Sequence, residues 1–159
     1  MTSLPPTTEP AATPRPADWR VGVWRTFLHA HAYVLGRLEH ELDSAVGLPL
    51  SWYDVLLQLA EAPSRRLRMA ELADRVLLSR SGLTRLIDRL QAEGLVRREP
   101  SPDDARGMYT VLTRDGLARL REAAPIHLAG IRTHWLSRFT DDELRTLGGL
   151  LGRVGPDEE

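Results

Sequence analysis

The chain has 159 residues, of which 42% are apolar and 27% are charged, and its net charge is −1. This length and composition are typical of one folded domain, and they exclude a disordered chain. The longest apolar run falls well short of the roughly 18 residues that a membrane-spanning helix needs, and no secretory signal is recognisable, so we expect a soluble, cytoplasmic protein. The lack of cysteine excludes disulfides, thiol catalysis and thiolate metal sites.

The charges are unevenly distributed along the chain. All 21 basic residues are arginines, and ten of them lie between positions 64 and 106 beside seven acidic residues, a net charge of +3. The rest of the chain carries a net charge of −4. A basic middle segment is typical of a protein that binds a polyanion. A solvated surface encoded by an arginine-rich genome explains the same counts, so charge alone leaves both interpretations open.

The first half of the chain predicts a tail followed by a long helix. Residues 1–17 contain five prolines and four threonines, which predicts a disordered tail. From Asp18 the apolar residues recur at steps of three and four, which predicts a helix from about 18 to 45 that ends at Gly47 and Pro49. A helix of this length is unusual in a small domain. We therefore expect part of its apolar face to meet a partner chain.

The central segment alternates short helices and strands. Ser51 is expected to cap a helix that stops before Pro63, and Ser79 is expected to cap a helix over 80–93 that ends at Gly94. Between and after these helices the patterns predict, in order, a strand at 66–68, a helix at 70–78, a strand at 95–99, a turn-rich loop at 100–107 and a strand at 108–112. This order is a helix-turn-helix followed by a β-hairpin wing.

The last segment is predicted to be helical from Thr113 to about Arg138. Pro125 lies inside it and removes one backbone donor, so we expect a kink or a break there. The run that starts at Thr140 matches a capping box, which predicts a final helix from Asp141 to about Arg153.

The helix predicted over 80–93 has two distinct faces. Four apolar residues share one side, and the opposite side carries Ser81, Arg85 and Asp88, flanked by Thr84 and Arg89. A recognition helix presents such residues to base edges, where arginine suits guanine and the threonine methyl suits thymine. Asp88 opposes DNA binding unless it pairs with Arg85 or Arg89. Any surface helix has a polar outer face, so a solvated face is the alternative.

The predicted hairpin tip at 102–107 places an acid two residues before an arginine. Asp104 can brace Arg106 by ion pairing and orient its guanidinium outward, where it suits the narrow minor groove of A·T-rich DNA. An ordinary polar turn is the alternative interpretation.

Four stretches together resemble the MarR family of winged-helix regulators over about residues 20–153: 79–90, 93–96, 104–106 and 112–116. The resemblance implies a mainly α fold with a small β-wing, in which dimerisation helices at 18–48 and 113–155 flank a winged helix-turn-helix lobe at 50–112. It also implies a homodimer on a pseudo-palindromic DNA operator. The candidate DNA contacts are Arg80, Ser81, Thr84, Arg85, Arg89, Asp104 and Arg106. One departure is Thr110, which occupies a position where the family usually has valine.

A small-molecule effector is a further possibility that the resemblance raises. Many relatives bind aromatic or phenolic anions in a crevice between the dimerisation helices and the DNA-binding lobe. The candidate lining residues here are Trp24, Phe27, His31, Trp52 and Tyr53, with a plain core or interface role as the alternative. His127 and His134 can share a helix face, but no acidic or cysteine partner has ligand spacing, so we predict no metal and no cofactor.

The expected function is therefore transcriptional regulation, with repression as the expected mode. The sequence has no phosphate-binding loop, nucleophile elbow or zinc-protease motif, so an enzyme is not expected. A ligand-independent regulator and a winged-helix module that binds protein remain as alternatives. Arginines at 85 and 106 favour DNA, because a protein-binding face is expected to expose apolar residues there.

Overall fold

The structure is a computed structural model that describes residues 18–76, 80–101 and 104–154, with the backbone alone at 80–81 and 104–106. The tail expected at 1–17 lies outside these residues. The chain divides into two units, residues 1–33 and 34–159, and helix α1 runs from one into the other. The elements in order are α1 Trp19–Val46, α2 Leu50–Glu61, a 3₁₀ turn Pro63–Arg65, β1 Arg66–Arg68, α3 Met69–Arg75, α4 Arg80–Ala92, β2 Val96–Ser101, β3 Asp104–Leu112, α5 Arg114–His134, a 3₁₀ turn Leu136–Arg138 and α6 Asp141–Leu151.

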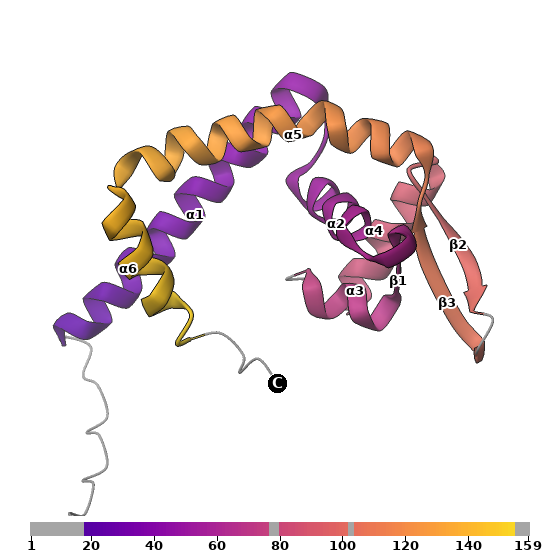
Figure 1. Ribbon diagram of the computed structural model, residues 1–159, viewed down its shortest axis with the longest axis horizontal. Helices are drawn as coiled ribbons and strands as arrows, with labels where there is room; N and C mark the ends of the chain where they lie inside the picture. The colour runs from indigo at the N-terminus through magenta and orange to yellow at the C-terminus, as the bar shows by residue number, and fades with distance from the viewer. Residues whose placement is uncertain (1–17, 77–79, 102–103, 155–159) are drawn as a thin grey trace, which may run out of the picture. The chain divides into compact units, whose positions relative to one another are not determined.

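The lobe from α2 to β3 is a helix-turn-helix joined to a three-stranded antiparallel sheet. The strand order is β1-β3-β2, so β3 pairs with both neighbours. Helices α2, α3 and α4 lie together beside this sheet (Figure 1). Their apolar residues form the core, in which Val55, Leu56, Leu59, Leu72, Leu83, Ile87 and Leu90 are fully buried. The fold class expected from the sequence is confirmed. No helix within the described ranges is long and apolar enough to cross a membrane.

The start of α2 differs from the expectation. Ser51 does not cap the helix; Pro49 is the N-cap residue, and it makes no side-chain cap hydrogen bond. Glu39 from α1 supplies the missing acceptor, because its Oε2 accepts the backbone N–H of Leu50 at 2.7 Å. The fixed φ of proline suits the residue that enters a helix, so the helix begins two residues earlier than the serine signal indicates.

The wing is longer and its loop shorter than expected. Strand β2 continues to Ser101 and β3 begins at Asp104, whereas the sequence predicts a loop over 100–107. The proline at position 100 does not end the strand, because β2 is an edge strand and proline is tolerated there. The register shifts between Pro100 and Ser101, which absorbs the irregularity in a bulge. Helix α3 ends at Arg75, and positions 77–78 of the helix expected over 70–78 lie outside the described residues.

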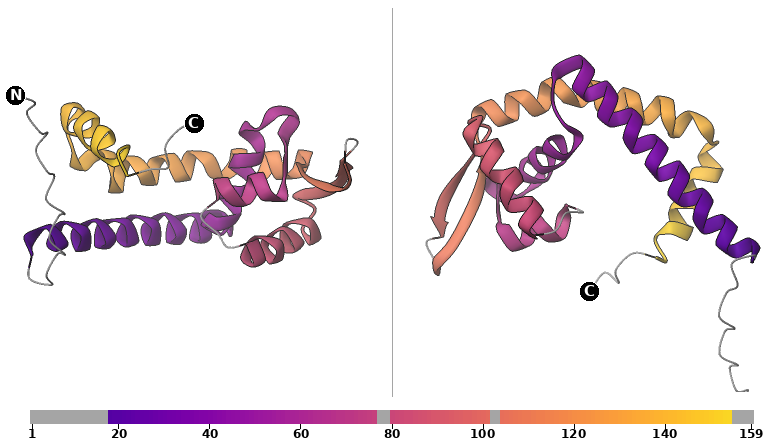
Figure 2. Two further views of the ribbon diagram at one scale, coloured as in Figure 1. Left: turned by 90° about the horizontal axis from the view of Figure 1, so that it is seen from below. Right: turned by 180° about the vertical axis from the view of Figure 1, so that it is seen from behind.

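Helix α5 passes through Pro125 without a break. The helix spans Arg114–His134, and Figure 2 draws it as an uninterrupted ribbon. The expected break is therefore wrong. Pro125 is exposed, and the helix continues through it although one backbone N–H donor is missing. The helix ends at His134, earlier than the expected Arg138, and a 3₁₀ turn follows.

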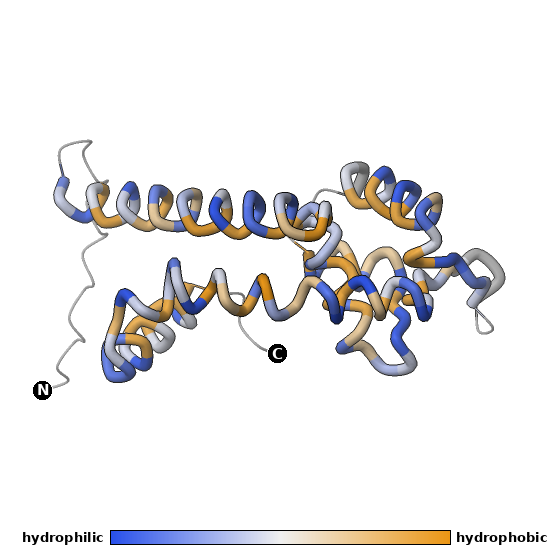
Figure 3. Tube along the Cα trace, turned by 90° about the horizontal axis from the view of Figure 1, so that it is seen from above, coloured by the Kyte–Doolittle hydropathy of each residue, from blue (hydrophilic) through white to orange (hydrophobic). Residues whose placement is uncertain are grey.

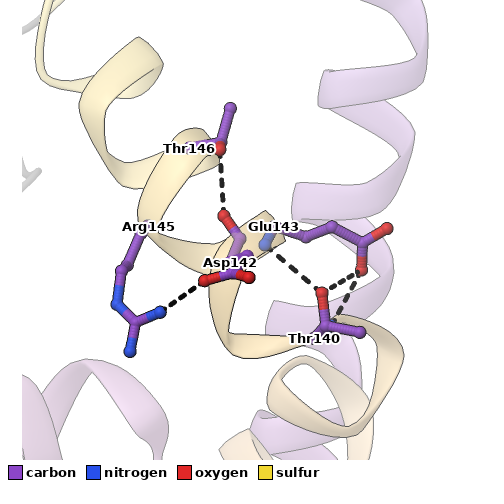
Figure 4. A network of polar contacts seen from close by, with 5 residues as sticks. All are labelled: Thr140, Asp142, Glu143, Arg145 and Thr146. Carbon is purple, nitrogen blue, oxygen red and sulfur yellow. Dashed lines mark hydrogen bonds and ion pairs between the residues drawn. The ribbon is translucent and has the colours of Figure 1, made fainter.

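The capping box at the last helix is confirmed. Thr140 Oγ1 accepts the backbone N–H of Glu143 at 3.3 Å, and Glu143 Oε2 accepts the backbone N–H of Thr140 at 2.8 Å (Figure 4). The backbone N–H of Thr140 and its Oγ1, which lies 3.0 Å from the same carboxylate oxygen, lower the pKa of the Glu143 carboxyl, because hydrogen bonds from both stabilise its charged form. Asp141 and Asp142 in the same first turn add negative charge where the helix dipole favours it.

The C-terminal half of α1 crosses α5 at very short range. A Cβ built on Gly130 would lie 2.6 Å from Leu38 Cδ2 and 2.9 Å from Glu41 Oε2, so a larger residue there would have to displace these side chains. Beside it, Glu41 Oε1 lies 2.6 Å from Nε2 of the buried His134. The hydrogen bond with His134 lowers the pKa of the Glu41 carboxyl below its ordinary value of 4.5, an effect larger than the opposing one of desolvation.

The Glu41–His134 contact makes a pH-dependent contribution to stability. A carboxyl group whose pKa is lowered by folding stabilises the fold above its ordinary pKa and loses that contribution as pH falls through its folded pKa. We expect wild-type protein to have a higher Tm than Glu41→Gln at pH 6, with a difference that shrinks below about pH 4.5. Thermal unfolding at one protein concentration between pH 3 and pH 7 measures this. A difference that stays constant over this range would contradict it.

Candidate nucleic-acid interface

Helix α4 has the two faces that the sequence predicts. Leu83, Ile87 and Leu90 are completely buried, and Leu86 is only 8% exposed. On the other side Thr84, Arg85, Asp88 and Arg89 are all exposed. Arg80 and Ser81 are the first residues of the helix, and the structure describes only their backbone. The buried leucines thus fix the rotation of α4 and direct Thr84, Arg85 and Arg89 to solvent.

The acidic residue on this face has a partner that the sequence reasoning missed. Asp88 Oδ1 accepts a hydrogen bond from a guanidinium nitrogen of Arg98 at 2.6 Å, and Gln91 Oε1 accepts another at 3.2 Å. This partner differs from Arg85 and Arg89, the two arginines that the sequence offered for such a pairing. Arg98 belongs to β2 and points to the same side as the buried Val96, because residues two apart in a strand share a face. That alternation was the signal that could have found it.

This ion pair connects α4 to β2 of the wing. The side chains of Asp88 and Arg98 are 55% and 29% exposed, so their coupling is that of a partly exposed pair. We expect a double-mutant cycle with Asp88→Asn and Arg98→Gln to give a coupling energy of about 0.2–1 kcal/mol. Denaturant unfolding of the four proteins measures it. A coupling indistinguishable from zero would mean that the pair does not stabilise the lobe.

The wing carries the second group of candidate residues. Asp104 and Arg106 lie on β3, inside the strand and not in a loop, and their side chains are outside the description. The predicted bracing of Arg106 by Asp104 therefore stays a prediction. The neighbouring pair on β2 is described: Arg97 and Glu99 form an ion pair across one face of the strand.

Two contacts hold the base of the wing. Thr110 is completely buried, and its Oγ1 donates to Met69 Sδ at 3.3 Å, which satisfies the hydroxyl that replaces the usual valine. Thr113 caps α5: its Oγ1 accepts the backbone N–H of Gly116 at 2.9 Å and lies within hydrogen-bond distance of the Gly94 and Leu95 carbonyl oxygens. The turn after α4 is thereby attached to α5.

The aromatic residues proposed as an effector crevice are divided between the two units of the chain, three in the first and two in the second. Trp24, Phe27 and His31 stack in sequence along α1, with ring centroids 5.8 Å and 6.1 Å apart, and all three are exposed. Hydrophobic residues recur on one side of this helix at each turn (Figure 3). Trp52 is half-buried and lines a cavity of about 360 Å³ with Glu93 and Arg119.

Tyr53 is directed elsewhere than its neighbour Trp52. It is 4% exposed, and its ring lies 4.3 Å from that of His127. Burial raises the pKa of the Tyr53 hydroxyl and lowers the pKa of the His127 imidazole, which favours the neutral form of both. Tyr53 belongs to the core, which is the alternative to a ligand-lining role that the sequence left open. A role of this set in ligand binding remains a prediction. In the part of the chain that the structure describes, no group of three or more potential ligands could hold a metal ion.

The fold and the arrangement of α4 and the wing are those of a winged helix-turn-helix regulator. Residues 46–107 match the model of the MarR family. The transcriptional repressor YetL of Bacillus subtilis is 31% identical over 68% of this chain and 66% of its own length. The multiple antibiotic resistance protein MarR of Escherichia coli is 30% identical over 76% of this chain and 82% of its own length. Sco3205, a MarR family transcriptional regulator from Streptomyces coelicolor solved in complex with DNA, is 36% identical, covers 90% of each chain and superposes with a TM-score of 0.83.

The chain belongs to the MarR family of winged helix-turn-helix transcriptional regulators. This membership confirms the family that residues 79–116 resemble, and it agrees with the expectation that the protein is a regulator and not an enzyme.

Proposed function

We propose that this protein is a homodimeric repressor that binds a pseudo-palindromic operator through α4 and the wing. The observation that carries the proposal is the exposed face of α4, where Thr84, Arg85 and Arg89 project opposite a fully buried leucine side. Sco3205, which is similar over 90% of the chain, has been solved with DNA, and YetL is a repressor. Repression of this kind takes place in the cytoplasm, with the genomic DNA.

The DNA-binding part of the proposal is tested by selection. The protein is incubated with a pool of random-sequence duplexes, and the bound sequences are amplified and aligned. We expect a pseudo-palindrome whose half-site centres lie about one helical turn, roughly 10 bp, apart. Recovery of no shared sequence would contradict sequence-specific binding and would favour a winged-helix module that binds protein.

Homodimer formation is supported by the apolar residues that the single chain leaves uncovered. Large hydrophobic side chains are exposed on α1, α5 and α6, among them Trp19, Val23, Leu128, Leu150 and Leu151. Exposed apolar area of this kind is characteristic of an obligate interface. Light scattering at micromolar concentration should give twice the chain mass, and deletion of residues 113–159 should give insoluble protein. A stable full-length monomer would refute the dimer.

A small aromatic or amphipathic acid is proposed as the effector that releases the operator. The stack of Trp24, Phe27 and His31 offers flat apolar surface beside a polar ring, the usual composition of a ligand site. A ligand that binds more tightly at one spacing of the two DNA-binding lobes of the dimer disfavours the other spacing. The resulting coupling between ligand binding and DNA binding is typically about 1–3 kcal/mol. Phenolic and aromatic carboxylates are screened for both thermal shift and operator release. If no compound does either, and Trp24→Ala changes only stability, the regulator is ligand-independent.

A further inference from the structure

One group of arginines in the basic middle segment has no part in the site described above. Arg66 and Arg68 both lie on β1, and Leu67 between them is buried in the core. Since alternate residues of a strand share a face, the two arginines project from the side of the sheet that faces away from the core. The pairing register places Tyr109 of β3 and Glu99 of β2 in one row with Arg68, and Arg97 in the row of Arg66.

The guanidinium groups of Arg66 and Arg68 lie over one aromatic ring on this outer sheet face. The guanidinium carbon of Arg66 lies 4.6 Å from the centroid of Tyr109, and that of Arg68 lies 5.5 Å from it. Arg66 is paired in the sheet with Val111, so its side chain reaches two residues along β3 toward the wing end to meet Tyr109. Stacking of this kind holds a guanidinium in place by cation–π attraction.

The stacked arrangement leaves the hydrogen-bonding edge of Arg66 available. A guanidinium carries its N–H donors in its own plane, so contact through its flat face does not consume them. Among the described residues, no carboxylate forms an ion pair with Arg66, whereas Arg97 is paired with Glu99 and Arg98 with Asp88. Among the described side chains, this face carries the guanidinium groups of Arg66, Arg68 and Arg97 and the carboxylate of Glu99, which is paired with Arg97.

This face is continuous with the wing. The row of Arg68, Tyr109 and Glu99 lies two residues, about 7 Å, from Ser101 at the end of β2. Arg68 also donates to the buried Ser101 Oγ at 3.2 Å, which links the cluster to the wing end of the sheet. A positively charged surface beside a DNA-contacting element matches the charge of the neighbouring phosphates.

We propose that the outer sheet face, through Arg66 stacked on Tyr109, binds backbone phosphates of the operator flank outside the minor groove that the wing enters. This proposal rests on the proposed DNA-binding function. It adds sequence-independent contacts that lengthen the bound site beyond the base pairs read by α4 and the wing tip. A phosphate contact by one residue in each protomer neutralises two phosphates per dimer.

The test compares two duplexes that carry the same selected operator. The short duplex ends at the minor grooves expected to receive the two wings, and the long duplex adds about 6 bp on each side. For the wild type we expect tighter binding and a steeper salt dependence on the long duplex. Each neutralised phosphate contributes about 0.9 to the magnitude of the slope of log K against log salt. Arg66→Gln, which removes one contact from each protomer, should therefore lower that magnitude by about 1.8 on the long duplex. On the short duplex it should bind like the wild type.

Three further variants separate position from charge. Arg121→Gln removes the same charge from an exposed site on α5 and should leave the difference between the duplexes unchanged. Tyr109→Phe keeps the ring and should retain the long-duplex advantage, whereas Tyr109→Leu should reduce it. The proposal is overturned if Arg66→Gln matches the wild type on the long duplex, the outcome expected for a surface that binds protein. It is also overturned if the loss is equal on both duplexes. Failure of the wild type to bind either duplex would instead overturn the proposed function.

Discussion

Arg85→Ala is expected to weaken operator binding by about 1–3 kcal/mol at each half-site and to relax the base preference at one position in it. Arg85 is exposed on the side of α4 opposite the buried Leu83 and Ile87, so the substitution removes a contacting side chain without disturbing the core. Arg85→Lys keeps the charge and loses the planar fork of donors that matches guanine. We therefore expect lysine to restore affinity partly and base preference hardly at all. Fluorescence anisotropy with the selected operator and single-base variants measures both.

The wing is expected to respond differently. Arg106→Ala should weaken binding most where the flanks of the site are A·T-rich, because a narrow minor groove concentrates negative potential. The two substitutions thus separate base reading in the major groove from shape reading in the minor groove. If neither variant changes affinity at moderate salt, α4 and the wing do not contact DNA as proposed.

Gly116→Ala is expected to destabilise the fold by about 1–3 kcal/mol, toward the upper end of that range. Gly116 lies in the first turn of α5, where a Cβ would sit 2.1 Å from the Leu95 carbonyl oxygen and 2.8 Å from Leu112 Cδ1. The nearest atom belongs to the backbone, so a side-chain rotation cannot relieve the overlap. The turn after α4 would have to move away from α5, which breaks the contacts of Thr113 with Gly94 and Leu95.

A matched glycine provides the control for this effect. Gly36 is interior to α1 on its polar side, and a Cβ built there has no neighbour within 4 Å. Gly36→Ala should therefore stabilise the protein by roughly 0.5–1 kcal/mol, because alanine favours a helix interior over glycine. Denaturant unfolding at fixed protein concentration compares the two variants. Equal effects would show that the close approach of Gly116 to Leu95 does not limit packing.

The sequence predicted the elements whose signals are local. The periodic apolar residues of α1 and α4, the capping box at Thr140 and the turn glycine Gly94 each depend on a few neighbouring residues. Gly94 has φ +73°, a conformation that glycine adopts without strain. Because periodicity also sets the rotation of a helix against its core, the buried and exposed faces of α4 followed from sequence as well.

Single-residue signals failed where a neighbouring segment altered their effect. Ser51 was expected to start α2, but Glu39 of α1 provides the acceptor and Pro49 starts the helix. Pro100 was expected to lie in a loop, but it occupies an edge strand that does not need its missing donor. Pro125 was expected to kink or break α5; the break is absent, because the helix runs through this exposed proline from Arg114 to His134.

By itself the sequence determined the winged helix-turn-helix order, the family and the candidate reading face of α4, because these depend on spacing within short segments. Only the tertiary structure decided which distant charges meet. It paired Asp88 with Arg98, ten residues away, and Glu41 with His134, 93 residues away, and it placed Arg66 over Tyr109. These contacts depend on strand register and helix crossing, which bring together residues that no local pattern connects.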